Sequence, residues 1–207
     1  DVEEAVKAAL EAQPSWGSIA VEERAQWLDQ IADRLEQRIE QIAVLESMDT
    51  GKPVRNARAI DAARSIANFR HFAHAVRSLH EDAYRMKDAL NYTQRVPVGV
   101  CGLISPWNLP LYLLSWKVAP AIAMGNTVVC KPSELTPLTA HLLGEVCTEV
   151  GLPPGVVNIV HGLGEEVGQA ITEHNDVRAV SFTGGTSTGQ KVATATAPRF
   201  AKTSLEL

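Results

Sequence analysis

The chain has 207 residues, of which 45% are hydrophobic and 21% are charged. These values are typical of a globular protein that buries a sizeable core in one large or two small domains, and they exclude a disordered chain. The formal net charge is −5, so the chain has no basic excess to hold nucleic acid or an anionic membrane, and a small-molecule partner is favoured.

Cysteine use and hydropathy indicate the cellular compartment and whether the chain has a membrane span. The three cysteines, Cys101, Cys130 and Cys147, are odd in number and lack metal-ligand spacing, which favours a reducing cytoplasm over a disulfide framework. No apolar run reaches the roughly 18 residues of a membrane span. The chain begins at Asp1, already inside a helical pattern and without a signal peptide, so we expect a chain trimmed at its start.

The first third of the chain predicts helices. Apolar residues repeat at helical spacing over 2–10, and we expect a break at Pro14–Gly17. One long apolar stripe then runs over 27–45, Gly51 can end this helix, and Pro53 can open the next. The inner side of that next helix is predicted to carry Ala59, Ala62, Ala63, Ile66, Phe69 and Phe72.

The pattern changes over 82–96. In "YRMKDALNYTQRV", Tyr, Thr and Val alternate with polar residues, and Lys87–Asp88 lies near a turn, which predicts an exposed β-hairpin. From Val98 onward, short β-branched runs alternate with amphipathic helices. This alternation indicates an α/β fold, a doubly wound parallel sheet covered on both faces. The predicted strands are 98–104, 126–130, 155–160, 178–182 and 202–206, and the predicted helices are 111–124, 136–150, 164–174 and 187–197.

The carboxyl ends of these strands are the place to expect a ligand. After the first strand, two prolines in Ser105–Pro110 fix a rigid turn that would present the indole of Trp107 and the amide of Asn108. The amide can serve a developing oxyanion, although a structural turn closed by an Asx-type bond is an equal alternative. After the second strand, Lys131 and Glu134 could hold two ribose hydroxyls or form a weak surface ion pair.

The next two turns are rich in glycine. Residues 162–168 read GxGxxxG, which is not the GxGxxG dinucleotide fingerprint and is a weak signal by itself. The turn over 182–189, "FTGGTSTG", can hold a pyrophosphate through backbone N–H groups or simply cap a helix, as Ser133 or Thr136 is predicted to do for the helix over 136–150. Four such turns in succession predict one crevice suited to a dinucleotide.

Other candidate sites are weaker. His71, His74 and His80 lie on a mostly polar helix and lack an acidic or cysteine partner, which favours a solvated face over a metal site. Cys101 and Cys130 lie in apolar strands as small core residues, and Cys147 has no nearby histidine in the sequence. None of the three cysteines has the pattern of an activated nucleophile.

The motifs together resemble a known family. "PWNLP", "GNTVVCKPSELTP", "GLPPGVVNIVHG", "SFTGGTSTG" and the terminal "SLEL" occur in the order and spacing of the NAD(P)-dependent aldehyde dehydrogenases, and the resemblance covers the whole chain. The stretch "ISPWNLPLYLLSWKVAPA" is most similar to the branch of the 2-aminomuconic and 2-hydroxymuconic semialdehyde dehydrogenases. The resemblance implies a Rossmann-like variant of the fold, truncated relative to the family, which also accounts for the absent GxGxxG.

This resemblance implies roles for single residues. Asn108 would supply the oxyanion amide, Trp107 would lie beside the nicotinamide, and Lys131 with Glu134 would hold the adenosine ribose. Because an acid at 134 repels a 2′-phosphate, NAD is favoured over NADP. Gly185 replaces a common serine of the family and leaves only a backbone N–H there. The implied cofactor contacts are Ile104, Ser105, Pro106, Trp107, Lys131, Ser133, Glu134, Gly164, Gly168, Phe182, Thr183, Gly184, Gly185, Thr188 and Leu207.

The resemblance also assigns Glu206 as the general base that activates water for thioester hydrolysis. The family's nucleophilic cysteine would lie several dozen residues beyond Leu207, so we expect the catalytic domain to be absent and this chain alone to be inactive. The implied division is a helical part of the cofactor-binding domain over 1–81, an oligomerisation hairpin over 82–97 and the dinucleotide-binding sheet over 98–207. The parent enzyme would oxidise an aldehyde to a carboxylate as a homodimer or homotetramer, and the resemblance to the branch named above suggests a semialdehyde as its substrate.

Two other functions remain open at the level of the residues. The chain could be a non-catalytic dinucleotide-binding or interaction module, complete as it stands, or a nucleotide-binding α/β protein unrelated to redox chemistry. A coding sequence that continues past Leu207 with "GGK" and a later cysteine would favour the enzyme, whereas a stop codon there would favour the binding module.

Overall fold

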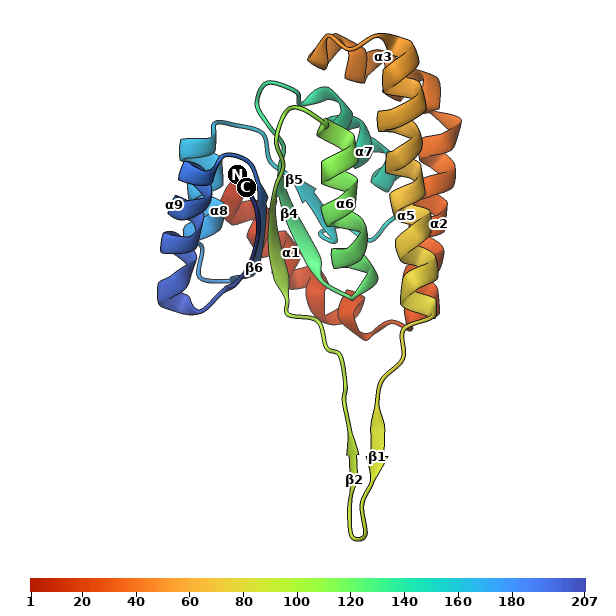
Figure 1. Ribbon diagram of the computed structural model, residues 1–207, viewed down its shortest axis with the longest axis vertical. Coiled ribbons are helices and arrows are strands. Elements are labelled where there is room, and N and C mark those ends of the chain that lie inside the picture. The colour runs from red at the N-terminus through yellow and green to blue at the C-terminus, as the bar shows by residue number, and fades with distance from the viewer.

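The computed structural model of the protein describes residues 1–207, and a five-stranded parallel sheet lies at its centre (Figure 1). The strand order is β5-β4-β3-β6-β7, and every neighbouring pair is parallel. Because the chain reverses direction of winding between β3 and β6, the switch point lies beside those two strands. The strands are β3 (Val100–Ile104), β4 (Thr127–Lys131), β5 (Val157–Ile159), β6 (Val177–Thr183) and β7 (Lys202–Glu206).

Helices cover both faces of the sheet, so the predicted doubly wound fold is confirmed. Successive side chains of β4 point to opposite faces: Val128 and Cys130 join the larger core, and Val129 joins the smaller one. The larger core is formed with α2 (Val21–Gln37), α5 (Ala63–Arg77), α6 (Pro110–Ala123) and α7 (Leu138–Glu149), and the smaller with α1 (Val2–Ser18), α8 (Gln169–Glu173) and α9 (Thr186–Thr196).

Two predictions for the first helices are wrong. Pro14–Gly17 does not break the chain but lies inside α1, because Trp16 is buried and its indole N–H donates to the carbonyl of Ile122 at 3.0 Å. The stripe over 27–45 is not one helix, since α2 and α3 (Ile39–Thr50) meet at Arg38. The guanidinium of Arg38 turns there to two glutamates of α7, Glu145 and Glu149. In both places a distant tertiary contact overrides the local pattern.

The helix after Pro53 is also more irregular than predicted. Gly51 ends α3 with a φ of 74°, as expected, and α4 (Val54–Asn56) leads into the π-helix η1 (Ala57–Ala62) before α5 begins. The wider π-turn rotates the buried face. The predicted inner residues Ala59 and Ala63 are therefore exposed, and Asp61 is buried instead.

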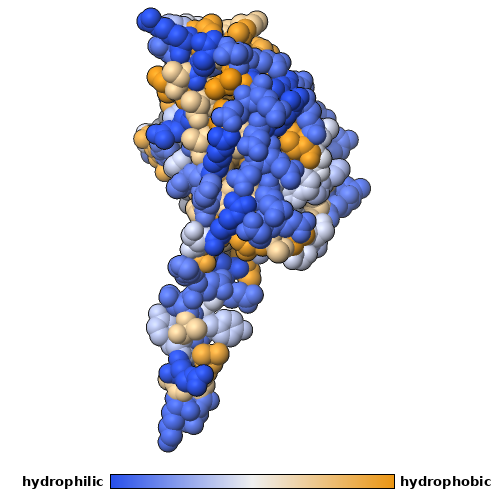
Figure 2. All heavy atoms as spheres, turned by 90° about the vertical axis from the view of Figure 1, so that its right-hand side faces the viewer, coloured by the Kyte–Doolittle hydropathy of each residue, from blue (hydrophilic) through white to orange (hydrophobic).

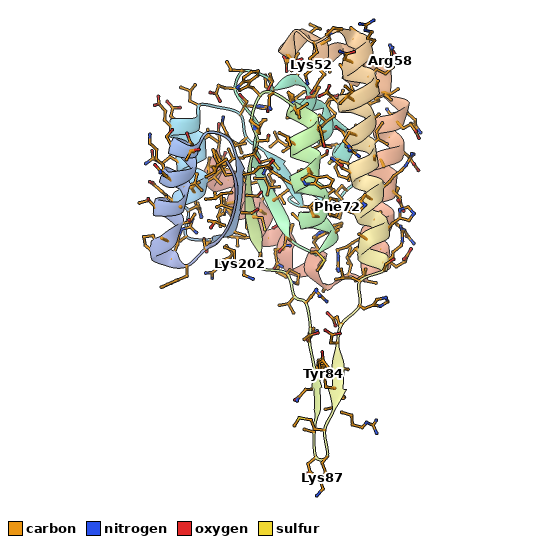
Figure 3. All side chains as sticks on the ribbon, viewed as in Figure 1. Lys52, Arg58, Phe72, Tyr84, Lys87 and Lys202 are labelled. Carbon is orange, nitrogen blue, oxygen red and sulfur yellow. The ribbon has the colours of Figure 1, made fainter.

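The hairpin prediction is confirmed. Strands β1 (Ala83–Arg85) and β2 (Leu90–Tyr92) pair antiparallel, with a bend at Lys87–Asp88, and they project from the body of the molecule (Figures 1 and 3). Its side chains are exposed, including the large apolar ones of Tyr84, Met86, Leu90 and Tyr92. In the view of Figure 2 the hairpin hangs below a body whose visible face, on the side of α2 and α5, is mostly hydrophilic.

Candidate functional site

A crevice of about 1120 Å³ opens along the carboxyl ends of β3, β4 and β6. It brings together the turns that the sequence singled out after these strands with the π-helix η2 (Gly164–Gly168). The predicted cofactor residues that line it are Ile104, Ser105, Pro106, Trp107, Lys131, Ser133, Glu134, Gly164, Gly168, Phe182, Thr183, Gly184, Gly185 and Thr188. Leu207 lies outside the lining. Its side chain packs against Gly189 of α9 so closely that a Cβ added to this glycine would lie 2.3 Å from the leucine Cδ2.

Lys131 and Glu134 form the best-defined polar pair of the crevice. Lys131 ends β4, and its ammonium donates to Oε2 of Glu134 at 2.6 Å. The lysine side chain is only 4% exposed, so this is not the weak surface pair that the sequence left open, whereas Glu134 is 40% exposed toward the crevice. The hydrogen bond from Lys131 lowers the pKa of Glu134, so its carboxylate is charged at neutral pH.

The cap of α7 differs from the prediction. Ser133 accepts a hydrogen bond from the backbone N–H of Leu135 at 3.3 Å, and the hydroxyl of Thr136 has no partner, so neither residue caps the helix. Oδ2 of Asp49 in α3 instead accepts from the N–H of Leu138 at 2.9 Å. The cap comes from a residue distant in the sequence, which frees Ser133 to line the crevice.

The glycine-rich turns leave open space and free donors. A Cβ at Gly164, Gly168 or Gly185 would meet no atom within 4 Å, so side chains there would fill a space that the crevice leaves open. Gly185 precedes α9, whose first N–H groups have no carbonyl partner within the helix and lie at its positive end. The buried hydroxyl of Ser105 also lacks a partner. These groups fit a ligand with hydroxyls and anionic phosphates, such as a dinucleotide.

The two predicted catalytic residues lie at the same edge of the sheet but outside the lining of the crevice. Asn108 is exposed on the turn after β3, next to Trp107, which is 56% exposed. Glu206 ends β7, where its carboxylate accepts a long hydrogen bond of 3.5 Å from Thr183 and its carbonyl accepts one of 3.1 Å from the N–H of Gly184. Since β6 lies between β3 and β7, the two residues flank the switch point of the sheet.

Lys117 lies outside the lining of the crevice but close enough to Glu206 to feel its charge, and the sequence reasoning did not single it out. It lies in α6, and its ammonium donates to the hydroxyl of Ser181 in β6 at 2.9 Å. Burial lowers the pKa of Lys117 to about 8, an effect that the carboxylate of Glu206 opposes. The only signal in the sequence is a single lysine within the otherwise apolar stretch "LYLLSWKVAPA".

The cysteines and histidines form neither a nucleophile nor a metal site in this structure. Cys101, Cys130 and Cys147 are buried free thiols, and burial raises the pKa of Cys101 and Cys147 to about 12 and that of Cys130 as well, so none is suited to attack a substrate. No group of three or more His, Cys, Asp or Glu residues is placed to hold a metal ion. His71 instead packs on Trp116 and Phe72 (Figure 3 labels Phe72). None of the helices combines the length and apolarity that a membrane crossing needs.

Comparison with known proteins agrees with this geometry. The 2-aminomuconic semialdehyde dehydrogenase of Homo sapiens is 51% identical over 100% of this chain and 43% of its own length. The 2-hydroxymuconic semialdehyde dehydrogenase of Pseudomonas sp. (strain CF600) is 47% identical over 100% of this chain and 44% of its length. The crystal structure of PnpE from Pseudomonas sp. WBC-3 gives a TM-score of 0.97 at 45% identity, covering 100% of this chain and 43% of that one.

A further crystal structure of PnpE, in complex with nicotinamide adenine dinucleotide, superposes equally well, with a TM-score of 0.97. The chain thus spans 43% of the length of the human relative. The family model described as "Aldehyde dehydrogenase family" matches residues 1–207. The resemblance stated from the sequence is therefore confirmed, and the chain belongs to the aldehyde dehydrogenase family.

Proposed function

We propose that these residues form the NAD-binding part of an enzyme that oxidises an aldehyde to a carboxylate. The observation that carries the proposal is the position of the crevice. Its Lys131–Glu134 pair and open glycine turns lie along the same edge of the sheet at which Asn108 and Glu206 stand outside the lining. Bound NAD would supply a hydride acceptor at this edge. The proposal is tested by adding an aldehyde and NAD to the full-length protein. We expect equal amounts of NADH and carboxylic acid, and no NADH with any aldehyde would overturn the assignment.

We infer NAD rather than NADP from the charge of Glu134. Lys131 keeps this carboxylate ionised, and Glu134 is half-exposed toward the crevice, where it can accept from the ribose hydroxyls. A 2′-phosphate in the same place would meet a fixed negative charge. Lys131 is already engaged by Glu134 and does not offer a free cation for that phosphate.

Each catalytic residue has one task in the proposed reaction. The attacking thiolate must come from outside the three buried cysteines of this chain, in keeping with the family cysteine expected beyond Leu207. Asn108 donates its amide N–H to the oxyanion that forms on the aldehyde oxygen when the thiolate attacks the aldehyde carbon. Glu206 takes a proton from the water that releases the acid from the cysteine thioester. Lys117 adds a buried positive charge beside Glu206.

We further propose that the substrate is a semialdehyde that carries a carboxylate. The relatives named above act, by their names, on muconic semialdehydes. In this chain the exposed guanidinium of Arg64 lies over the ring of Tyr112, 5.8 Å from its centroid. Tyr112 is in the first turn of α6, four residues after Asn108. Arg64 forms no ion pair with an acidic residue of the chain, so it is free to bind a carboxylate with both of its N–H edges.

Replacement of Arg64 by alanine tests this substrate class. In the full-length protein we expect Arg64→Ala to raise KM for a carboxylated semialdehyde by at least about tenfold, because one charge-assisted pair contributes roughly 1.5–3 kcal/mol. KM for an uncharged aldehyde of similar length should not change. Arg58→Ala is the matched control, since Arg58 is already paired with Glu40. Equal effects on both aldehydes would contradict the role of Arg64.

We also propose that the protein assembles with further copies of itself and that it is located in the cytoplasm. The exposed Tyr84, Leu90 and Tyr92 of the hairpin would be buried against a second copy in a homodimer or homotetramer. Residues 82–97 would then be the oligomerisation segment, between the helical part over 1–81 and the sheet over 98–207. The three free thiols favour the cytoplasm.

A further inference from the structure

Glu46 of α3 is a buried acid without a partner. Its side chain is 0% exposed, and both of its carboxylate oxygens are buried without a hydrogen bond. An unpaired carboxylate in the interior is strongly destabilising unless another group offsets its charge. The groups around Glu46 therefore decide what this residue can do.

Three elements and one loop face Glu46. They contribute the carboxylate of Asp61 from η1, the ammonium of Lys52, the hydroxyl of Thr139 from α7 and the backbone N–H of Leu111 from α6. Lys52 forms an ion pair with Asp61, with 2.6 Å between Nζ and Oδ1. The carboxylate of Asp61 therefore offsets much of the positive charge that Lys52 presents to Glu46. The Thr139 hydroxyl has no partner of its own. The remaining source of positive potential is the first turn of α6.

That turn needs an acceptor. Pro110 is the first residue of α6, and Leu109 provides no side-chain cap. The N–H of Leu111 has no carbonyl partner within the helix, because the residue four positions earlier lies before the helix begins. Leu111 is also 0% exposed, so bulk water cannot satisfy its N–H. The Leu111 N–H at the positive end of α6 thus lies near the buried carboxylate and attracts its charge, although the two groups do not complete a hydrogen bond.

The same turn of α6 follows the catalytic turn directly. Leu109 alone separates Asn108 from Pro110, and the two prolines that flank Trp107 and Asn108 make this connection stiff. Figure 3 shows Lys52 at the end of the molecule opposite the hairpin, which is the end where β3 passes into α6 in Figure 1. A shift of the start of α6 would therefore move the Asn108 amide.

We propose that Glu46 is a positioning residue for Asn108. From its buried place on α3, where this helix meets η1 and α7, Glu46 holds the first turn of α6. This role rests on the proposed function, in which the Asn108 amide meets the oxyanion. Glu46 does not line the crevice, so it acts on the aldehyde step and not on cofactor binding.

The charge of Glu46 makes this role sensitive to pH. Burial raises its pKa to about 7; Asp61 adds to the rise, and Thr139, Lys52 and the Leu111 N–H oppose it. The charged form is the stronger acceptor for the positive end of α6. The hold on α6 therefore strengthens as the pH rises through about 7.

The test compares Glu46→Leu, Glu46→Gln and the control Ser65→Ala in the full-length protein. Ser65 is equally buried, but its hydroxyl bonds only to the Asp61 carbonyl within its own helical segment. The readouts are hydrogen exchange of the amides over 109–114, NAD affinity, and the rate of the first NADH turnover as a function of pH.

We expect Glu46→Leu to speed exchange over 109–114 and to slow the first turnover by about ten- to a hundredfold, since a small misplacement is enough for such a loss. NAD affinity should stay unchanged. Glu46→Gln keeps an acceptor for Leu111 and should retain slow exchange, while the inflection near pH 7 disappears from the rate profile. Ser65→Ala should behave as the wild type.

Unchanged exchange in Glu46→Leu, or the same loss in Ser65→Ala, would overturn the role of Glu46. If Glu46→Leu does not fold, Glu46→Gln decides, because a pH profile identical to that of the wild type would overturn the proposal. A wild-type protein that oxidises no aldehyde would instead refute the proposed function. Hydrogen exchange would still show in that case whether Glu46 holds the start of α6.

Discussion

In the helical layer, Arg70 of α5 reaches across to Asp33 and Glu36 of α2, whereas along the carboxyl edge of the sheet the hydroxyl of Ser105 and the amide of Asn108 lack such partners. The first region consists of polar groups that satisfy one another on an exposed face, and it holds two helices together. The second keeps donors unused around an open crevice. A buried polar group without a partner needs a reason of its own. Ser105 lines the crevice, where a ligand can pair its hydroxyl, whereas Glu46 is a buried acid without a hydrogen bond that lies outside the crevice.

Among substitutions that test this contrast between the two regions, the one at Asn108 is expected to change the reaction rate most. In the full-length protein, Asn108→Ala removes an oxyanion donor and should slow the first NADH turnover by about a hundred- to a thousandfold. NAD affinity should not change, because Asn108 lies outside the crevice lining. Single-turnover kinetics and a cofactor titration measure the two effects. A variant with wild-type turnover would show that the Asn108 turn is only structural.

A smaller effect is expected at Glu134, the charged member of the crevice pair. Glu134→Gln removes the repulsion of a 2′-phosphate and weakens the bonds to the ribose, so the preference for NAD over NADP should fall by about tenfold or more. The ratio of kcat/KM for the two cofactors in the full-length protein measures the change. Glu165, which lines the same crevice without an ion pair, offers the matched control Glu165→Gln. An unchanged ratio would mean that Glu134 does not select the cofactor.

The smallest effect is expected in the helical layer. Arg70 is 39% exposed, so solvent screens its pairs with Asp33 and Glu36, and Arg70→Ala should lower the free energy of unfolding by less than about 1 kcal/mol. Kinetic constants and cofactor affinity should be those of the wild type. Denaturant titration and steady-state kinetics of the variant check both statements. A large loss of activity would show that the helical layer is coupled to the site.

The sequence predicts the sheet well because its signals are local. Short β-branched runs bounded by Gly or Pro locate β3, β4, β5 and β6, and the last strand, β7, is predicted with the bounds that the structure has. The site turns follow from the same pattern, because parallel strands place their carboxyl ends at one edge. Thus Lys131 and Glu134 could be paired from the sequence, and they are in contact.

What the sequence could not predict depends on partners far along the chain. The cap of α7 comes from Asp49, which lies 89 residues before Leu138, and the break at Arg38 depends on glutamates of α7. The π-turn of η1 buries Asp61 by rotating the helix face, a change that no regular period contains. Lys117 of α6 likewise reaches Ser181 of β6, which is 64 residues further along the chain.

The most direct test of the whole account is a burst experiment on Glu206→Gln in the full-length protein. If Glu206 activates the water that releases the acid, the variant should still form a burst of NADH equal to the enzyme concentration, followed by a slow steady state, because oxidation precedes hydrolysis. Stopped-flow detection of NADH separates the two phases. A steady-state rate equal to that of the wild type would contradict the assignment of this edge of the sheet as the active site of an aldehyde dehydrogenase.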